Sequence, residues 1–258
     1  MSRHAIFSFV TVCGSRLEVE RIPAAREGLP ALVFLHEGLG SVSMWRHFPA
    51  AVSAATGCET VVYSRYGYGK SDSLQERRRV DYMHREALEA LPELLSKLEI
   101  ERPVLVGHSD GGSIAIICAG ANHRARGLAL LAPHVFVEDI SIQGIAAAKD
   151  AFRSTDLSGK LARHHADAER TFWGWNELWL HPDFRRWNIE EYLPRIDCPV
   201  LAVQGYQDAY GTMAQLDAIE RQVKSRLTLV KLERCGHSPH RDQPEATLAA
   251  VADFVRSV

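Results

Sequence analysis

Cysteine is scarce in this sequence and shows no pairing pattern. The 258 residues include five cysteines, and none of them forms a Cys-x-x-Cys pair. They are Cys13, Cys58, Cys118, Cys198 and Cys235. An odd number of widely spaced cysteines argues against a disulfide framework and against a cysteine-ligated zinc site. We therefore expect reduced thiols and a cytoplasmic protein.

Long apolar runs and an excess of charge of one sign are also missing. No stretch reaches the length needed to cross a membrane, and the N-terminal residues lack the apolar core and cleavage site of a signal peptide. The formal net charge is only -2, without an extended basic run, which argues against nucleic acid as the main ligand. We therefore expect no membrane and no nucleic acid among the partners. The sequence leaves a homodimer open.

Residue patterns for metals and cofactors are lacking as well. The twelve histidines include the adjacent His164 and His165, but no cysteine or carboxylate pattern surrounds them. Neighbouring residues of a helix point to different faces, so these two are poorly placed to share an ion. The sequence also lacks the Gly-x-Gly-x-x-Gly fingerprint of a dinucleotide site. We expect neither a metal nor a cofactor.

One segment has the pattern of a nucleophile in a tight turn. An apolar run at residues 104–106 leads into Gly107-His108-Ser109-Asp110-Gly111, and a small, apolar segment follows. This pattern predicts a strand, a sharp turn and a helix, with the Ser109 hydroxyl exposed in a strained conformation. Ser71 is the rival, but a phosphate-binding loop needs a glycine where this chain has Ser64. We therefore predict Ser109 as the nucleophile.

A serine nucleophile needs a histidine that accepts its proton. A strand-like alternation at residues 227–232 is followed by a loop that contains His237 and His240. His237 follows Gly236, whose flexibility lets the histidine turn inward. We predict His237 as the base and keep His240 as the alternative, because Pro239 places it at the start of a turn into the last helix.

The histidine in turn needs an acid that orients it. Asp208 follows the strand predicted at residues 199–205 and precedes the one that leads to His237. We predict Asp208 as this acid, although it could instead only cap the helix that begins near Thr212. Glu138 and Asp139, which follow another predicted strand, are the reserve candidates.

Strands and helices alternate along most of the chain. The pattern predicts an N-terminal hairpin at residues 5–22, which turns at Cys13-Gly14, and six further strands at 31–36, 59–63, 103–107, 126–131, 199–205 and 227–232. Helices are predicted at 43–55, 83–98, 112–121, 212–223 and 244–258, with a kink at Pro92 in the second. Such alternation is typical of an α/β fold with a mostly parallel sheet and helices on both faces.

A long helical segment interrupts this alternation between residues 131 and 199. Helical patterns at 140–153, 157–165 and 167–180 predict an inserted lid over residues 135–194, with residues 1–134 and 195–258 as the core domain. Five aromatic residues lie in this segment: Phe172, Trp173, Trp175, Trp179 and Trp187. We expect at least half of them only to hold the lid helices together and predict Trp173, Trp175 and Trp179 as candidates for the substrate pocket.

The chain resembles the α/β-hydrolase superfamily over nearly all its length. The resemblance rests on Leu35-His36-Glu37-Gly38-Leu39-Gly40, on the Ser109 motif, and on the order Ser109, Asp208, His237. It implies a doubly covered, twisted sheet, a helical lid and an oxyanion hole. The resemblance also implies that backbone N–H groups of Gly38 and Asp110 form this hole, with Leu39 or Glu37 as other donors from the first loop.

Glu37 departs from the His-Gly pair that is usual in this superfamily. A carboxylate beside a developing oxyanion opposes catalysis by about 4 kcal/mol at an intermediate dielectric constant. Glu37 must therefore point away, be paired or be protonated. The Ser-Asp-Gly-Gly run is similar to that of amino-acid ester hydrolases of the valacyclovir hydrolase type. We therefore include Glu37 and His108 as pocket candidates, with Glu37 or Asp110 as the acceptor of a cationic substrate group.

The sequence thus predicts a serine esterase that acts on a small or medium carboxylic ester through Ser109, His237 and Asp208. The substrate would be a small-molecule ester or thioester. Thioesterase, lactonase and carbon–carbon bond hydrolase activities use a similar triad and are the alternatives. A ligand-binding protein without catalysis is the alternative of another class, but a pure binder has no need of all three residues.

Overall fold

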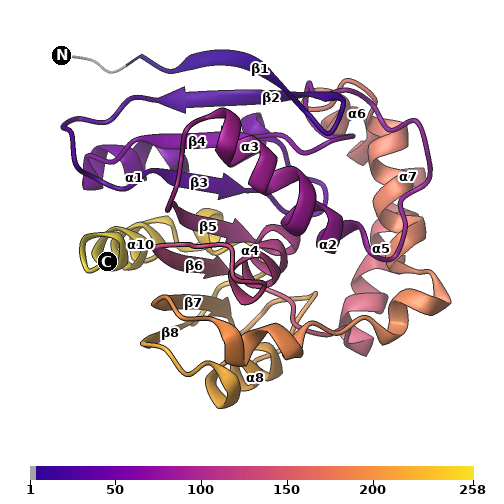
Figure 1. Ribbon diagram of the computed structural model, residues 1–258. Helices are drawn as coiled ribbons and strands as arrows, with labels where there is room; N and C mark the ends of the chain where they lie inside the picture. Colours follow the sequence, from indigo (N-terminus) through magenta and orange to yellow (C-terminus); the bar gives the residue numbers. More distant parts are fainter. Residues whose placement is uncertain (1–3) are drawn as a thin grey trace.

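The core of the protein is one eight-stranded sheet. The computed structural model describes residues 4–258, and the strands lie in the order β1-β2-β4-β3-β5-β6-β7-β8 (Figure 1). Their bounds are β1 (Ile6–Val12), β2 (Ser15–Ile22), β3 (Leu32–Leu35), β4 (Thr60–Tyr63), β5 (Val104–His108), β6 (Gly127–Leu131), β7 (Val200–Gly205) and β8 (Leu227–Leu232). Strands β3 to β8 pair in parallel, whereas β1 and β2 form an antiparallel hairpin. The predicted fold class is confirmed.

The N-terminal hairpin turns where the sequence predicted. Cys13 has a φ of 48° and Gly14 a φ of 79°, and two successive residues with positive φ match the right-handed twist of the strands that they join. β2 then pairs with β4. The strands β3 to β7 are buried along their whole length, which explains their nearly continuous apolar sequences.

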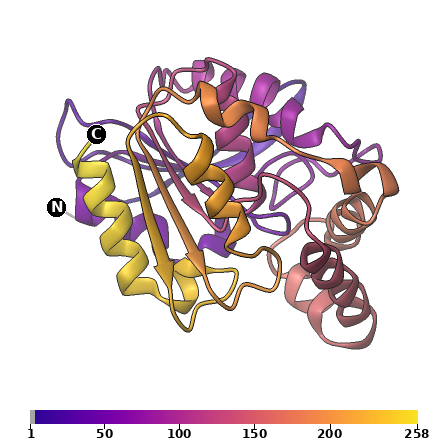
Figure 2. The same ribbon diagram turned by 90° about the horizontal axis from the view of Figure 1, so that it is seen from below.

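Helices cover both faces of the sheet, as Figure 2 shows from below. One face carries α1 and α10, with a core that includes Phe34, Trp45 and Val251. The opposite face carries α2 to α4 and α8, with a separate core that includes Met83, Ile116 and Ile219. The bounds are α1 (Phe48–Thr56), α2 (Tyr82–Arg85), α3 (Leu91–Lys97), α4 (Asp110–Gly120), α8 (Ala214–Gln222), α9 (Pro239–Asp242) and α10 (Pro244–Arg256).

Two helix predictions need correction. The helix predicted at 43–55 is a 3-10 turn, η1 (Val42–Trp45), followed by α1, because Arg46 has a φ of 53° and interrupts the helical backbone. The helix predicted at 83–98 contains a π-helical turn, η2 (Glu86–Ala90), between α2 and α3. Pro92 is the second residue of α3, which directly follows the π-helical turn, and the departure from the α-helical ladder there accommodates a residue that has no N–H to donate. The sequence predicted a disturbance near Pro92 but not its form.

Three helices fill most of the segment between β6 and β7, which we call the β6–β7 insertion (residues 132–199). They lie beyond the carboxyl ends of the parallel strands (Figure 1). Phe152 and Phe172 stack with ring centroids 3.9 Å apart, and Asn176 Nδ2 donates to the carbonyl of Ile145, so the helices form one packed unit. The bounds are α5 (Asp139–Ser154), α6 (Leu157–Ala162), α7 (Ala168–Trp179), η3 (Pro182–Arg186) and η4 (Glu190–Arg195).

The helices of the described chain include none that combines the length and the apolar character of a membrane span.

Leu130 tests how much the fold depends on the core beneath the sheet. This β6 residue is fully buried, and we expect Leu130→Ala to lower the free energy of unfolding by about 2–5 kcal/mol, because it leaves a cavity. Leu88→Ala, at a side chain that is 37% exposed, is the matched control and should change it by less than about 0.5 kcal/mol. Urea titrations measure both. Equal losses in the two variants would contradict the described core.

Candidate active site

Ser109 lies in the sharp turn between β5 and α4. Its φ of 53° and ψ of -119° lie outside the usual regions for a residue with a side chain, a strain that is found at functional sites. Asp110 begins α4 directly afterwards. Ser109 therefore lies between the carboxyl end of β5 and the N-terminus of α4.

Two glycines make this turn sterically feasible. A Cβ atom at Gly107 would lie 2.3 Å from the carbonyl oxygen of Gly111, and one at Gly111 would lie 2.0 Å from the carbonyl oxygen of Leu35. Real Cβ contacts are never this short, and the obstacles are backbone atoms that do not move aside. Glycine at both positions thus lets α4 pack closely against β3 and β5.

The structure brings Ser109, His237 and Asp208 together in a hydrogen-bonded row. His237 Nε2 lies 2.9 Å from Ser109 Oγ, and His237 Nδ1 lies 2.9 and 2.8 Å from the two carboxylate oxygens of Asp208. An ionised carboxylate only accepts hydrogen bonds, so Nδ1 carries the proton and Nε2 is left to accept one from the serine. The three residues follow β5, β7 and β8, whose carboxyl ends meet at one edge of the sheet.

Asp208 is held in place by several donors. Its carboxylate accepts hydrogen bonds from Gln204 Nε2 at 2.7 Å and from the Tyr210 N–H at 2.8 Å. Burial raises the pKa of Asp208, but the hydrogen bond and the charge of His237 outweigh it, so the pKa lies below its usual value. Asp208 is therefore ionised at neutral pH, as a residue that orients an imidazole must be.

The alternative candidates lie elsewhere. His240 is buried beside Trp45, with ring centroids 4.9 Å apart, and makes no hydrogen bond to the described residues. Glu138 accepts hydrogen bonds from Thr212 and Gln215. Asp139 forms an ion pair with Arg185. None of the three candidates contacts Ser109 or His237 in the way that the reactive row requires.

Two residues that line the cavity over Ser109, Gly38 and Asp110, have backbone N–H groups without a hydrogen bond to the described residues. Asp110 is the first residue of α4, so its N–H has no partner within the helix. The Gly38 N–H makes no hydrogen bond to the described residues. A Cβ atom at position 38 would lie 2.1 Å from Trp175 Nε1, so only glycine fits between this loop and α7. This arrangement suits the donor pair that the sequence predicted.

Glu37 is paired and thus meets the condition that the sequence analysis set for it. Its carboxylate lies 3.3 Å from His108 Nδ1 and 3.5 Å from Arg241 Nη2. His108 Nε2 lies 2.7 Å from the carbonyl oxygen of His237, so His108 links the loop of Glu37 to the loop of the base. Burial raises the pKa of Glu37, but the hydrogen bond with His108 and the nearby positive charges hold it well below its usual range.

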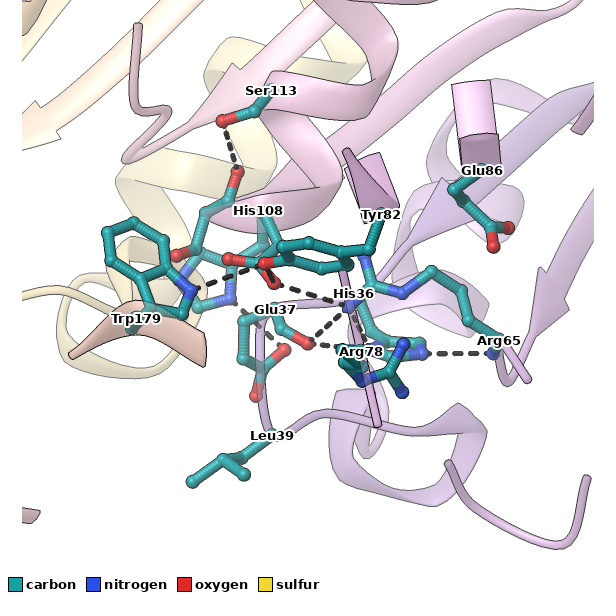
Figure 3. A network of polar contacts seen from close by, with 12 residues as sticks. His36, Glu37, Leu39, Arg65, Arg78, Tyr82, Glu86, His108, Ser113 and Trp179 are labelled. Carbon is teal, nitrogen blue, oxygen red and sulfur yellow. Dashed lines mark hydrogen bonds and ion pairs between the residues drawn. The ribbon is translucent and has the colours of Figure 1, made fainter. Parts of the chain in front are cut away.

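Asp110 belongs to a second buried network, of which Figure 3 labels Tyr82, Arg65 and Trp179. Its Oδ2 atom accepts a hydrogen bond of 2.5 Å from the Tyr82 hydroxyl and lies 3.8 Å from Arg65. Trp179 Nε1 donates to the same hydroxyl at 3.2 Å, so α2, α4 and α7 meet here. Burial raises the pKa of Asp110, against the lowering influence of Arg65 and Tyr82. Its Oδ1 atom is buried without a hydrogen-bond partner in the described chain.

A small cavity opens over Ser109. Its volume is about 120 Å³, and Trp175 and Trp179 of the insertion line it together with the loop at residues 37–39. The structure does not bring the other two pocket candidates to it. Trp173 packs on Phe152 and donates to Glu169, because its position on α7 faces away from Ser109, and His108 lies beneath the reactive row.

The sequence analysis missed three residues that line this cavity, which are Tyr210, His134 and Ser141. Tyr210 lies over His237 with ring centroids 4.8 Å apart, and His134 lies beside it at 5.6 Å. The signal for His134 was its position just after the predicted strand at 126–131, where polar residues reach the same sheet edge. Across residues 4–258, no three His, Cys, Asp or Glu side chains gather in a group that could hold a metal ion.

Comparisons with known proteins agree with this fold. A family model described as the alpha/beta hydrolase family matches residues 32–251. A search of curated proteins finds no significant match. Among solved structures, the chain is similar to 2-hydroxy-6-oxo-6-phenylhexa-2,4-dienoate hydrolase from Rhodococcus sp. strain RHA1, with a TM-score of 0.81 and 17% identity over 99% of this chain and 100% of the other.

Two further structures are similar over nearly the whole chain. The enol-lactonase from Burkholderia xenovorans LB400 has a TM-score of 0.75 and 19% identity, with 96% of this chain and 100% of that one covered. Naproxen esterase from Bacillus subtilis has a TM-score of 0.73 and 18% identity, with 98% and 92% covered. Identities this low show a shared fold and not a shared substrate.

A Glu37 variant tests whether the paired carboxylate stabilises the folded protein. We expect Glu37→Gln to lower the free energy of unfolding at pH 7 by about 1–3 kcal/mol. His108 and Arg241 each contact a different carboxylate oxygen, and the neutral amide of glutamine offers only one acceptor oxygen and no charge. A carboxyl whose pKa falls on folding stabilises the protein above its unfolded pKa, near 4.3 for Glu. The difference in free energy of unfolding between wild type and Glu37→Gln should therefore shrink as the pH falls below about 4.3. It should vanish once the pH lies below the lowered pKa that Glu37 has in the folded protein.

Urea unfolding from pH 7 to pH 3 measures this difference, with Glu220→Gln at an exposed position as the control. A difference that persists unchanged to pH 3 would show that the charge of Glu37 does not stabilise the fold.

Proposed function

On the premise that the chain belongs to the alpha/beta hydrolase family and is a hydrolase, we propose that it cleaves small or medium carboxylic esters with Ser109 as the nucleophile. The observation that carries this proposal is the row from Ser109 Oγ to His237 Nε2 at 2.9 Å and from His237 Nδ1 to Asp208 at 2.8 Å. A base within hydrogen-bond distance of the nucleophile, itself oriented by an acid, is the arrangement that activates a serine.

The reaction proceeds in two halves. Ser109 Oγ attacks the ester carbonyl while His237 Nε2 takes its proton, and the imidazolium that forms is stabilised by Asp208. The N–H groups of Gly38 and Asp110 donate to the oxyanion of the tetrahedral intermediate. His237 then gives its proton to the departing alcohol. A water molecule, deprotonated by the same histidine, releases the acid from the acyl-enzyme.

The β6–β7 insertion serves as a lid in this proposal, and residues 135–194 form the lid domain. Trp175 lies against Gly38, and Trp179 donates to Tyr82 beside Asp110, so the insertion contacts both sides of the proposed oxyanion hole. The cavity of about 120 Å³ favours compact substrates. Its aromatic walls favour an apolar acyl or alcohol group.

Related reactions are the alternatives within the same site. A thioester, a lactone or a carbon–carbon bond beside a carbonyl would each use the same nucleophile and base. The names of two similar structures, an enol-lactonase and a hydrolase of a 2-hydroxy-6-oxo-dienoate, support including a lactone and a vinylogous diketone in the substrate panel. A binding protein without catalysis would have no need of the aligned Ser109, His237 and Asp208.

A substrate with an amino group is a second candidate, favoured by one observation. Asp110 Oδ1 is buried without a hydrogen-bond partner in the described chain, and Asp110 lines the cavity. An ammonium group would supply the missing donor and a compensating charge. Glu37, the other carboxylate considered for this role, is engaged by His108 and Arg241.

The proposal predicts that Ser109→Ala abolishes hydrolysis of p-nitrophenyl acetate, an acyl thioester and a lactone, because the acyl acceptor is gone. Loss of a catalytic serine leaves rates lower by about 10⁶ in a comparable triad. Initial rates for purified wild type and variant measure the effect, and Ser96→Ala at an exposed position should match the wild type. Equal rates in wild type and Ser109→Ala would refute the assignment.

The second candidate predicts a preference for the p-nitrophenyl ester of L-alanine over that of propionic acid. The two differ by one amino group, and Asp110→Asn should lower the ratio of their kcat/KM values by about 10–100-fold, the effect of a hydrogen bond to a charged group. Asp253→Asn, in the exposed part of α10, is the control. An unchanged ratio in Asp110→Asn would leave the neutral esters as the substrate class.

A further inference from the structure

His134 is a second histidine in the cavity that the proposed reaction does not use. It is 2% exposed, lines the cavity over Ser109, and lies between the rings of His237 and Trp179, whose centroids are 5.6 and 5.3 Å from its own. It follows β6 closely, and thus comes from a different strand end than any residue of the reactive row.

The backbone around His134 is fixed on both sides. Ser113 Oγ donates to the His134 carbonyl oxygen at 2.6 Å, and the N–H of Val135 donates to Gln215 Oε1 at 2.7 Å. Helices α4 and α8 therefore hold the segment from two directions. The ring is set in place before a substrate arrives, which is the usual property of a binding group.

The side chain, in contrast, makes no hydrogen bond to any residue between 4 and 258. Nδ1 is fully buried without a hydrogen bond, and no hydrogen bond joins the ring to any described residue. Nδ1 lies toward Gly211, which does not line the cavity, and Nε2 is not among the enclosed unpaired atoms. Nε2 is therefore the ring nitrogen left to face the cavity that His134 lines. Burying a polar ring without a hydrogen bond costs free energy. A phenylalanine ring would fill the same space without this cost.

His134 carries no charge at neutral pH. Burial, followed by the proximity of His237, lowers its pKa to about 3. A neutral imidazole has one N–H donor and one acceptor nitrogen. Because an enclosed N–H is the rarer defect, the proton belongs on Nε2, at the edge that faces the cavity. The ring thus presents a donor without adding a positive charge beside the imidazolium that His237 becomes during turnover.

The location relative to His237 indicates which part of a substrate this donor meets. His237 returns its proton to the oxygen of the leaving alcohol, so that alcohol must lie beside His237. The oxyanion donors Gly38 and Asp110 belong to other elements. A ring next to His237 therefore contacts the alcohol and not the carbonyl oxygen.

Resting on the proposed esterase function, we propose that His134 is a specificity-determining residue that donates a hydrogen bond from Nε2 to an oxygen acceptor in the leaving alcohol, close to the ester bond. The preferred substrates are esters of hydroxy, alkoxy or keto alcohols, in place of plain alkyl esters. His134 changes the relative rates for esters of different alcohols, because the attack of Ser109 on the carbonyl is the same for all of them.

Two esters of the same acid test this assignment. 2-Methoxyethyl acetate and n-butyl acetate have equal chain lengths and differ in one ether oxygen. After division by the ratio for alkaline hydrolysis, which removes the intrinsic difference in reactivity, wild type should prefer the methoxyethyl ester by about tenfold in kcat/KM, the usual effect of one neutral hydrogen bond. His134→Phe should abolish this preference, and His134→Gln, which retains an N–H donor, should restore part of it.

His240→Phe is the matched control, because His240 is a buried histidine without a partner that lies outside the cavity. It should retain the wild-type ratio. A corrected ratio near one in wild type, or a ratio that survives in both His134 variants, would overturn the role of His134. If one of the two His134 variants fails to fold, the ratio in the other variant decides. If the wild type hydrolyses none of the three esters, which are the two acetates and p-nitrophenyl acetate, the esterase proposal is overturned, and this inference with it.

Discussion

Close packing of α4 against the sheet is the constraint on which the site depends. The absence of side chains at Gly107 and Gly111 lets the helix begin within contact distance of the backbone of β3 and β5. The turn that remains forces Ser109 into a left-handed backbone conformation and leaves the N–H of Asp110 free of intrahelical bonds. The same approach brings the loop after β3, with Gly38, beside Ser109. One steric condition thus positions the nucleophile and both proposed oxyanion donors.

Three carboxylates lie near Ser109, and each of them has different partners. Asp208 is ionised and faces His237, where it stabilises the charge that the base acquires. Glu37, whose pKa also lies below its usual range, pairs with His108 and Arg241. Asp110 shares Tyr82 and Arg65 and keeps one oxygen without a partner in the described chain. Because charges interact strongly at low dielectric, these separate pairings allow a negative intermediate to form among three acids.

The sequence predicted the sheet and the reactive row because both depend on local patterns. The buried strands β5 and β7 are short apolar runs, and β8 alternates apolar and polar residues. Ser109, Asp208 and His237 follow these three strands in turn, so parallel strand ends bring them together. The partners of Glu37 and Asp110 depend on contacts between segments far apart in the chain, such as Arg241 and Tyr82, and no local pattern shows them. Trp173 shows the same limit. Aromatic composition marked α7 as part of the pocket, but its rotation about its own axis decided which rings face Ser109.

Helix ends were harder to predict for a similar reason. Arg46, with its positive φ, interrupts a segment that the sequence pattern predicts as one helix. The π-helical turn directly precedes the helix that contains Pro92, and a proline alone does not specify the form of the distortion around it. His134 was missed because a single histidine after a strand has no motif around it, and its meaning comes from the unpaired ring in the cavity.

The central claim is that Ser109 is activated as a nucleophile by His237. The most direct measurement is the intact mass of the folded protein after reaction with a fluorophosphonate, followed by peptide mapping. The account predicts one adduct, located on Ser109, and strongly slowed labelling in His237→Ala. No adduct on the folded wild type, or an adduct on another residue, would contradict it.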